Sequence, residues 1–345
     1  MFRFEKEQSV WDFNGTKIGG QPGEYPTVLG ASIFYNKHEI VKNDHTGEID
    51  KETAEALWNR CLELTDITGI PFFIQIIAEF GEAFESYFDW FTSIDNKTAF
   101  LMDSSAPAAL AHATRYVTEV GIADRAIYNS INGSISQENI DALANSDVDA
   151  AIVLAFNPGD PSVAGRQKVL NEGGVAGQTK SMLQIAEEAG IKRPILDTAA
   201  TPLGIGSGGA YREILACKAI HGYPTGGAYH NMTVSWTWLK RWKGSKKNPS
   251  KLAETLQGKD KYVAQLLHHY QGGMDGVIQA AWSAPDIGCN LIASALGADL
   301  IMFGPIENVE PMITAQAYAD ITILEAARDL GIEVLSEEHP IFKLV

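Results

Sequence analysis

The sequence predicts an α/β protein built as a (β/α)8 TIM barrel, in which eight parallel strands form a closed ring and a helix follows each strand. Eight short, nearly continuous apolar segments alternate along the chain with segments of helical periodicity. Continuous apolar segments of this length are typical of strands that are buried on both faces of a parallel sheet. The chain has 345 residues, which is enough for eight such units. A doubly wound open sheet is the alternative, and the regularity of the repeats disfavours it.

The expected elements follow one another in a simple order. Strands are expected at 27–35, 71–78, 98–105, 126–132, 150–157, 194–200, 225–230 and 300–304. Helices are expected at 51–68, 82–92, 107–120, 137–144, 174–189, 209–221, 261–269, 287–296 and 315–330. We expect a single domain over 1–345, with a short hairpin in 1–20 and an insert at 232–285 after the seventh strand. Asn14-Gly15 supplies the turn of the hairpin.

Composition excludes several classes of function. The formal net charge of −16 argues against a nucleic-acid partner, because the phosphate backbone would be repelled. The longest apolar runs are far shorter than the roughly 20 residues of a membrane span, and the first residues do not resemble a secretion signal. Together with three widely spaced cysteines, these features favour a cytoplasmic protein with reduced thiols and no metal site in this chain.

One part of the chain has the opposite charge. No acidic residue stands between Glu213 and Glu254, and the second half of this stretch is basic, with Lys240, Arg241, Lys243, Lys246, Lys247 and Lys251. A run of this kind is usually a solvated loop, and the alternative is a surface for an anionic ligand tail or an acidic protein.

Polar residues at the ends of the expected strands are the candidate site. Ligands of such barrels bind at the carboxyl ends of the strands. The segment 124–134, DRAIYNSINGS, begins as a strand and ends in amide and hydroxyl side chains. The positions that share this placement include Gln75, Asp103, Asn129, Ser130, Asn157, Asp197 and Asn231. Carboxylates accept pairs of N–H groups and carboxamides match an amide edge, so this set suits a pterin. For each residue alone, capping of its own loop is the competing interpretation.

Four longer motifs carry a resemblance to a known family. IGGQPGEYPTV, TEVGIADRAIYNSINGSI, AAIVLAFNPGDPSV and TPLG resemble the MtrH subunit of the tetrahydromethanopterin:corrinoid methyltransferase complex and its bacterial relatives, which methylate tetrahydrofolate from a corrinoid protein. The resemblance covers about residues 19–231. It implies a pterin-binding barrel that moves a methyl group between the cobalt of a corrinoid protein and N5 of a reduced pterin.

The resemblance also assigns roles to residues. The aspartate of the family's DS motif falls on Asp103, its NS asparagine on Asn129, its second aspartate on Asp197, and the asparagine beside the methyl-bearing nitrogen on Asn231. Asn231 and Asp197 are therefore the expected catalytic residues. Asn157, Gln75 and Ser130 are expected to join them in binding the pterin, and the ligands of the corrinoid itself are not identified.

The most specific expectation is a bacterial-type enzyme that forms 5-methyltetrahydrofolate in a methylamine or glycine betaine demethylation pathway. Its cofactors would be tetrahydrofolate and the cobalamin of a partner corrinoid protein, and family analogy implies a homodimer. Two alternatives stay open: a tetrahydromethanopterin-using MtrH subunit of a methyltransferase complex, and a docking subunit without catalysis. A dihydropteroate synthase-like enzyme would need basic residues for a diphosphate, and the strand ends offer none.

Overall fold

The computed structural model describes residues 2–236 and 273–345, without the side chains of 273–282. The expected helix at 261–269 and the basic segment at 240–251 lie outside the described residues, as does most of the insert expected at 232–285.

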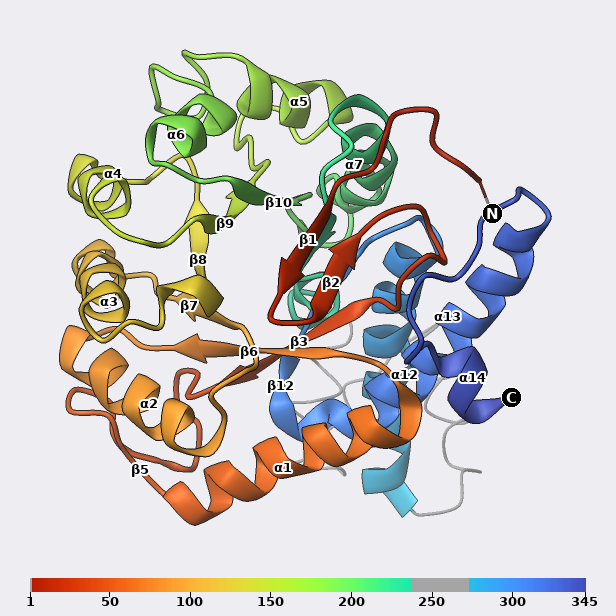
Figure 1. Cartoon of the computed structure of the whole chain (residues 1–345), viewed down its shortest axis with the longest axis horizontal. Coiled ribbons are helices and arrows are strands. Elements are labelled where there is room, and N and C mark those ends of the chain that lie inside the picture. The colour runs from red at the N-terminus through yellow and green to blue at the C-terminus, as the bar shows by residue number, and fades with distance from the viewer. Residues whose placement is uncertain (1, 237–272) are drawn as a thin grey trace, which may run out of the picture.

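Eight parallel strands close into a barrel, as predicted (Figure 1). In ring order they are β3 (Val28–Ile33), β6 (Phe72–Ile77), β7 (Phe100–Asp103), β8 (Ala126–Ile131), β9 (Ala150–Leu154), β10 (Arg193–Asp197), β11 (Thr225–Gly227) and β12 (Leu300–Pro305). A small antiparallel pair, β4 (Val41–Asn43) and β5 (Glu48–Ile49), lies between β3 and the first long helix.

Helices surround the ring of strands (Figure 1). They are α1 (Lys51–Thr68), α2 (Gly81–Ile94), α3 (Pro107–Glu119), α4 (Gln137–Ala144), α5 (Val163–Asn171), α6 (Met182–Glu188), α7 (Ser207–Ile220), α8 (His230–Val234), α12 (Gly273–Ala295), α13 (Val309–Arg328) and α14 (Pro340–Leu344). Local sequence sets their limits. Helix α1, for example, begins where the Asp50 carboxylate accepts a hydrogen bond from the Thr53 N–H and ends at Gly69, whose φ of 78° suits glycine.

The N-terminal hairpin closes one end of the barrel. Strands β1 (Val10–Phe13) and β2 (Thr16–Gly19) pair antiparallel, and Figure 1 shows them across the centre of the ring. Phe13 and Ile18 are buried in the inner core of the barrel. Trp11 Nε1 donates a hydrogen bond of 2.8 Å to the carbonyl of Pro194, at the start of β10. The hairpin therefore covers the amino ends of the strands, and the carboxyl ends, which we call the mouth, lie at the other side.

Two features differ from the expected elements. The seventh strand, expected at 225–230, ends at Gly227 because the chain turns there into α8. The sequence does not predict helix α5, because its apolar periodicity is weak. Ser162 begins this helix by accepting a hydrogen bond from the Gly165 N–H, and a glycine-rich loop separates it from α6, which is shorter than expected.

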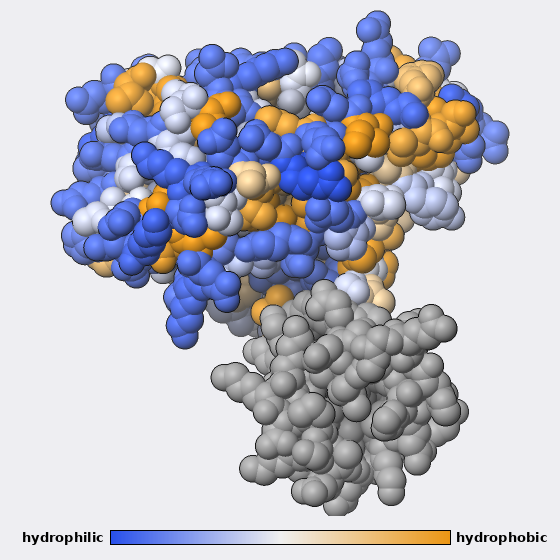
Figure 2. All heavy atoms as spheres, turned by 90° about the horizontal axis from the view of Figure 1, so that it is seen from below, coloured by the Kyte–Doolittle hydropathy of each residue, from blue (hydrophilic) through white to orange (hydrophobic). Residues whose placement is uncertain are grey.

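Hydrophilic side chains cover much of the face on the α1 side, with hydrophobic ones interspersed among them (Figure 2). None of the helices in residues 2–236 and 273–345 is both long enough and apolar enough to span a bilayer.

Candidate functional site

Alternation along the strands brings a set of polar side chains to the mouth of the barrel. Side chains two residues apart on a strand point to the same face. The inner core contains Phe73, Leu101, Ile127 and Ile195, so the residues two positions further on also face the barrel interior. These residues are Gln75, Asp103, Asn129 and Asp197. Where β7 pairs with β8, Asp103 lies opposite Asn129. Where β6 pairs with β7, Ile77, the last residue of β6, lies opposite Asp103.

A short chain of hydrogen bonds orients Asp103. Ser32 Oγ donates to Gln75 Oε1 over 3.0 Å, and Gln75 Nε2 donates to Asp103 Oδ2. Burial raises the pKa of Asp103 to about 6, the hydrogen bond from Gln75 opposes this rise, and the charge of Glu79 adds to it. Ser32 was not among the expected site residues. Its place at the end of a buried apolar strand was the signal that could have identified it.

Asp197 reaches the same interior from β10. Its Oδ1 accepts a 2.8 Å hydrogen bond from the Ala199 N–H. Burial raises the pKa of Asp197 to about 6; the negative charge of Asp103 adds to the rise and the positive charge of Arg166 opposes it. Gly227 lies close by, because a Cβ there would stand 3.0 Å from Asp197 Oδ1. The second carboxylate oxygen of each aspartate has no hydrogen-bond partner among the described protein atoms, so both can accept N–H groups from a ligand.

A buried arginine holds the loop that follows Asp197. The Arg166 side chain is 1% exposed, and its guanidinium donates to the carbonyls of Thr198 and Ala199 at 3.0 and 3.1 Å. Glycine is required at position 209, because a Cβ there would stand 2.5 Å from Arg166 Nη1. Arg166 Nη2 also donates to the carbonyl of Gly206, directly before α7, at 3.4 Å, so this arginine joins the start of α7 to the loop that follows Asp197.

The remaining expected residues have different surroundings. Asn129 is half-buried, with its Nδ2 4.0 Å from the sulfur of Met302. The peptide bond between Asn129 and Ser130 is cis, and Ser130 Oγ accepts a hydrogen bond from Asn132. Asn157 is used by its own loop: its Nδ2 donates to a carbonyl at 3.0 Å and its Oδ1 accepts two N–H groups. The capping interpretation thus describes Asn157 well.

Asn231 lies in the first turn of α8, directly after β11. It is exposed, and its carboxamide has no hydrogen-bond partner within residues 2–236 and 273–345. The neighbouring His230 is fixed by contrast: its Nδ1 lies 2.9 Å from the Met302 carbonyl, and its ring packs against Gly304, where a Cβ would stand 3.1 Å from the ring. Burial lowers the pKa of His230, which favours the neutral imidazole. Within the described residues, Asn231 therefore offers an available amide beside the mouth, and His230 is a fixed support.

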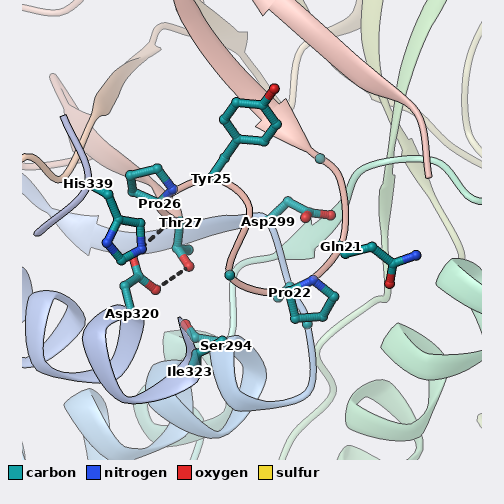
Figure 3. Close-up of a pocket in the computed structure, with 14 residues that line it drawn as sticks. Gln21, Pro22, Tyr25, Pro26, Thr27, Ser294, Asp299, Asp320, Ile323 and His339 are labelled. Carbon is teal, nitrogen blue, oxygen red and sulfur yellow. Dashed lines mark hydrogen bonds between the residues drawn. The ribbon is translucent and has the colours of Figure 1, made fainter. Parts of the chain in front are cut away.

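A small second pocket lies at the opposite end of the barrel (Figure 3). It has a volume of about 20 Å³, room for roughly one water molecule. Asp320 of α13 accepts hydrogen bonds from the N–H and the hydroxyl of Thr27, which precedes β3, at 2.8 and 2.9 Å. His339 lines the same pocket, and its Nε2 is buried without a partner among the described atoms. This pocket joins α13 and the C-terminal segment to the start of β3 and is separate from the mouth.

The comparisons with known proteins agree on one family. The family model described as the tetrahydromethanopterin S-methyltransferase MtrH subunit matches residues 6–335. The MtrH subunit of the tetrahydromethanopterin S-methyltransferase of Methanosarcina barkeri is 47% identical over 345 residues, with 100% of both chains covered. The protein of the same name from Methanopyrus kandleri is 43% identical, with 97% of both chains covered.

Solved structures support the fold. The 7,8-dihydropteroate synthase of Vibrio fischeri superposes with a TM-score of 0.52 at 13% identity, over 91% of this chain and 97% of that chain. A dihydropteroate synthase of Xanthomonas albilineans gives a TM-score of 0.50 at 15% identity, over 93% and 98%. At these identities the likeness concerns the barrel alone.

The expectation that the pterin is tetrahydrofolate was wrong. The resemblance to the bacterial relatives favours tetrahydrofolate as methyl acceptor and cofactor, in a bacterial demethylation pathway. The matched family and the full-length relatives are instead named for tetrahydromethanopterin. The motifs that carried the resemblance were matched to users of both carriers, so they could not separate the two. The alternative, a tetrahydromethanopterin-using MtrH subunit, fits these findings better.

Proposed function

The chain belongs to the tetrahydromethanopterin S-methyltransferase MtrH family, a family of methyltransferase subunits, and from this premise we propose that it binds tetrahydromethanopterin at the mouth of its barrel and catalyses transfer of the methyl group on N5. The observation that carries the proposal is a pair of carboxylates in the barrel interior, the half-buried Asp103 and the buried Asp197, each with an oxygen open to a ligand beside the carboxamide of Asn129.

The pterin head fits this set of donors and acceptors. Its ring N–H and exocyclic amine form an edge that an ionised carboxylate accepts with two parallel hydrogen bonds. Asp103 and Asp197 supply carboxylates, and Asn129 matches the neighbouring amide edge of the ring. Gln75 fixes the orientation of Asp103 and Arg166 supports the loop after Asp197, so both carboxylates are held in place before the ligand arrives.

The methyl transfer itself requires alignment and control of one proton. The bond between the methyl carbon and N5 breaks, N5 keeps the electron pair and gains a proton, and the methyl group passes in line to the nucleophilic cobalt of a corrinoid carried on a partner protein. An amine is a poor leaving group unless it is hydrogen-bonded or protonated. Asn231 is exposed beside the mouth, and its carboxamide has no hydrogen-bond partner among the described residues, so we assign it to hold the water that delivers this proton.

Equilibrium binding and single-turnover transfer test the proposal together. The purified chain is mixed anaerobically with methyl-tetrahydromethanopterin and cob(I)alamin, and the absorbance of the cobalt is followed. We expect transfer that is lost in Asp103→Asn and slowed, with little loss of binding, in Asn231→Ala. Transfer by Asn231→Ala at the wild-type rate would exclude the role given to Asn231.

The docking alternative makes a different prediction. A subunit that only presents the pterin would bind it through Asp103 and Asp197 but show no transfer to free cob(I)alamin or to the corrinoid protein. The homodimer implied by the family resemblance is a further part of the proposal, and analytical ultracentrifugation of the purified chain tests it.

A further inference from the structure

A hollow of about 620 Å³ lies beside the mouth, where β3 and β6 end. The segment after β3 contributes Tyr35, Lys37 and Lys42 to its lining, and the segment after β6 contributes Glu79 and Phe80. Ser105, two residues after Asp103, lines it too, and its hydroxyl donates to Glu79 over 2.8 Å. Ser105 therefore connects the lining of the hollow to the end of β7, where Asp103 lies, although Asp103 is not itself part of the lining.

The wall formed by Tyr35 is held rigidly. The ring of His38 stacks on that of Tyr35, with centroids 4.2 Å apart and an interplanar angle of 11°. His38 Nδ1 accepts the Phe34 N–H at 3.0 Å, so its Nε2 carries the proton and lies 2.7 Å from Glu307 Oε1. The Tyr35 hydroxyl donates to the same oxygen at 3.1 Å. His38 and Glu307 thus fix the ring of Tyr35 at the edge of the hollow.

The opposite wall carries an exposed aromatic ring. Phe80 is 38% exposed and packs against the ring of His45, with centroids 4.3 Å apart. Lys37 and Lys42 are exposed, and neither forms a salt bridge within the described residues. Asp44 also lines the hollow, and Glu79 is engaged with Ser105 at its inner end. The outer end therefore combines an aromatic surface with two ammonium groups that form no salt bridge with a carboxylate of the described residues, although the charge of Lys42 reaches Asp50, whose pKa is lowered by hydrogen bonds from Thr53 and, less strongly, by this charge.

The strand order places one wall of the hollow, the segment that follows β3, on the side to which a bound pterin would direct its substituent. The head is anchored by residues of β7, β8 and β10, and in the closed ring β12 and β3 lie across from β8 and β9. A reduced pterin carries its arm at C6, away from the edge that carboxylates recognise. The arm then leaves the mouth over β12 and β3, where Glu307 and Tyr35 meet.

We propose that this hollow binds the arm of tetrahydromethanopterin, with its aryl ring against Tyr35 and Phe80 and its anionic end near Lys37 and Lys42. The inference rests on the proposed function and extends it, since it assigns a site for the part of the substrate that takes no part in methyl transfer. Such remote contacts increase affinity without touching the reacting atoms.

The test compares two ligands and four proteins. Affinities for tetrahydromethanopterin and for 6-methyltetrahydropterin, which has the head without the arm, are measured anaerobically by titration calorimetry. The proteins are the wild type, Lys37→Glu/Lys42→Glu, Phe80→Ala, and the control Lys97→Glu/Lys192→Glu. The control makes the same charge change at exposed residues that precede β7 and β10, at the opposite end of the barrel.

We expect Lys37→Glu/Lys42→Glu to weaken tetrahydromethanopterin binding at least about five-fold at low salt, and less at high salt, because exposed charge pairs are screened. Phe80→Ala should weaken it by about three-fold or more without salt dependence, since the contact is apolar. Binding of 6-methyltetrahydropterin should match that of the wild type in both variants, and the control should match it for both ligands.

Equal loss in the control, or unchanged tetrahydromethanopterin affinity in both hollow variants, would overturn the assignment of the arm. The two ligands keep this outcome separate from failure of the proposed function. If wild-type protein binds neither ligand, the pterin proposal itself is wrong and the assignment of the arm falls with it.

Discussion

Asp103 and Asp197 end two strands, β7 and β10, that are not neighbours in the barrel, yet the charge of Asp103 raises the pKa of Asp197. Asp197 is buried and Asp103 is half-buried, each carboxylate is oriented by one donor from the protein, and each keeps an oxygen for a ligand. Two carboxylates without ion-pair partners in the barrel interior do not stabilise the folded protein. Their arrangement therefore points to a ligand that supplies the missing hydrogen-bond donors.

Asparagine at either position should abolish most of the pterin affinity. Asp103→Asn and Asp197→Asn keep the shape of the side chain but replace an acceptor oxygen by a donor that opposes the N–H groups of the pterin. Hydrogen bonds to charged groups contribute about 1.5–3 kcal/mol, so we expect a loss of about 10- to 150-fold in affinity. Calorimetric titration measures it. A loss smaller than three-fold in both variants would contradict the assigned binding mode.

The pterin affinity of the wild type should depend on pH. Both pKa values lie at about 6, and the ionised carboxylates are the forms that accept N–H groups. Affinity should be nearly constant above about pH 7 and fall below pH 6 by up to about 100-fold for each pH unit, about ten-fold for each of the two protons. Titrations between pH 5 and 8 test this. The Asp197→Asn variant should show a shallower fall, because one of the two protons is no longer taken up.

The same burial should lower the stability of the free protein at neutral pH. The pKa of Asp197 is raised from 3.8 to about 6 in the folded state, so folding favours the protonated form. The contribution of protonated Asp197 to the free energy of unfolding is therefore complete below about pH 4 and is lost as the pH rises to about 6. At pH 7 Asp197→Asn should therefore be more stable than the wild type by on the order of 2–3 kcal/mol. Urea unfolding at pH 5 and pH 7 should show that the difference in unfolding free energy between Asp197→Asn and the wild type grows with pH. An Asp197→Asn variant that is less stable than the wild type at pH 7 would contradict this prediction.

Gln75 should affect the pH at which pterin affinity falls, because it donates a hydrogen bond to Asp103. Its hydrogen bond favours the ionised carboxylate and opposes the rise in the pKa of Asp103. In Gln75→Leu this donor is lost, so the midpoint for pterin binding should move to higher pH, by about one unit. Ser32→Ala removes only the far end of the chain of hydrogen bonds and should shift the midpoint less. Equal midpoints in Gln75→Leu and the wild type would show that Gln75 does not act on Asp103.

Arg166 should matter for both stability and binding. Arg166→Met leaves the carbonyls after Asp197 unpaired in the interior and should cost about 3–5 kcal/mol, with weaker pterin binding as the loop loses its support. Arg115→Met is a matched control, because Arg115 is exposed and pairs with Glu138 on the surface; it should cost less than about 1 kcal/mol. Similar unfolding free energies for the two variants would contradict the structural role of Arg166.

The sequence predicted those parts of the fold and the site that depend on one strong local pattern. Continuous apolar segments predicted the eight strands, and strand-end position predicted Asp103, Asn129 and Asp197 in the barrel interior, which the alternation of side chains explains. Helix α5 was missed because it is short and weakly amphipathic, and its start depends on the cap by Ser162. The involvement of Ser32 and Arg166 depends on contacts between distant segments, which spacing along the chain does not encode.

The choice of pterin could not be made from those residues. Asp103, Asn129 and Asp197 contact the head in the proposed complex, and the head is where the two carriers are most alike. The distinguishing part is the arm, and the hollow beside Tyr35 and Phe80 is built from loop residues without a recognisable motif.

The most direct test is single-turnover transfer from methyl-tetrahydromethanopterin to cob(I)alamin by the wild type and by Asp103→Asn, with tetrahydromethanopterin affinity measured on the same preparations. We predict formation of methylcobalamin with the wild type, and loss of both transfer and affinity in Asp103→Asn without loss of the folded state. Wild-type rates and affinity in Asp103→Asn would contradict the assignment of the mouth of the barrel as the pterin site.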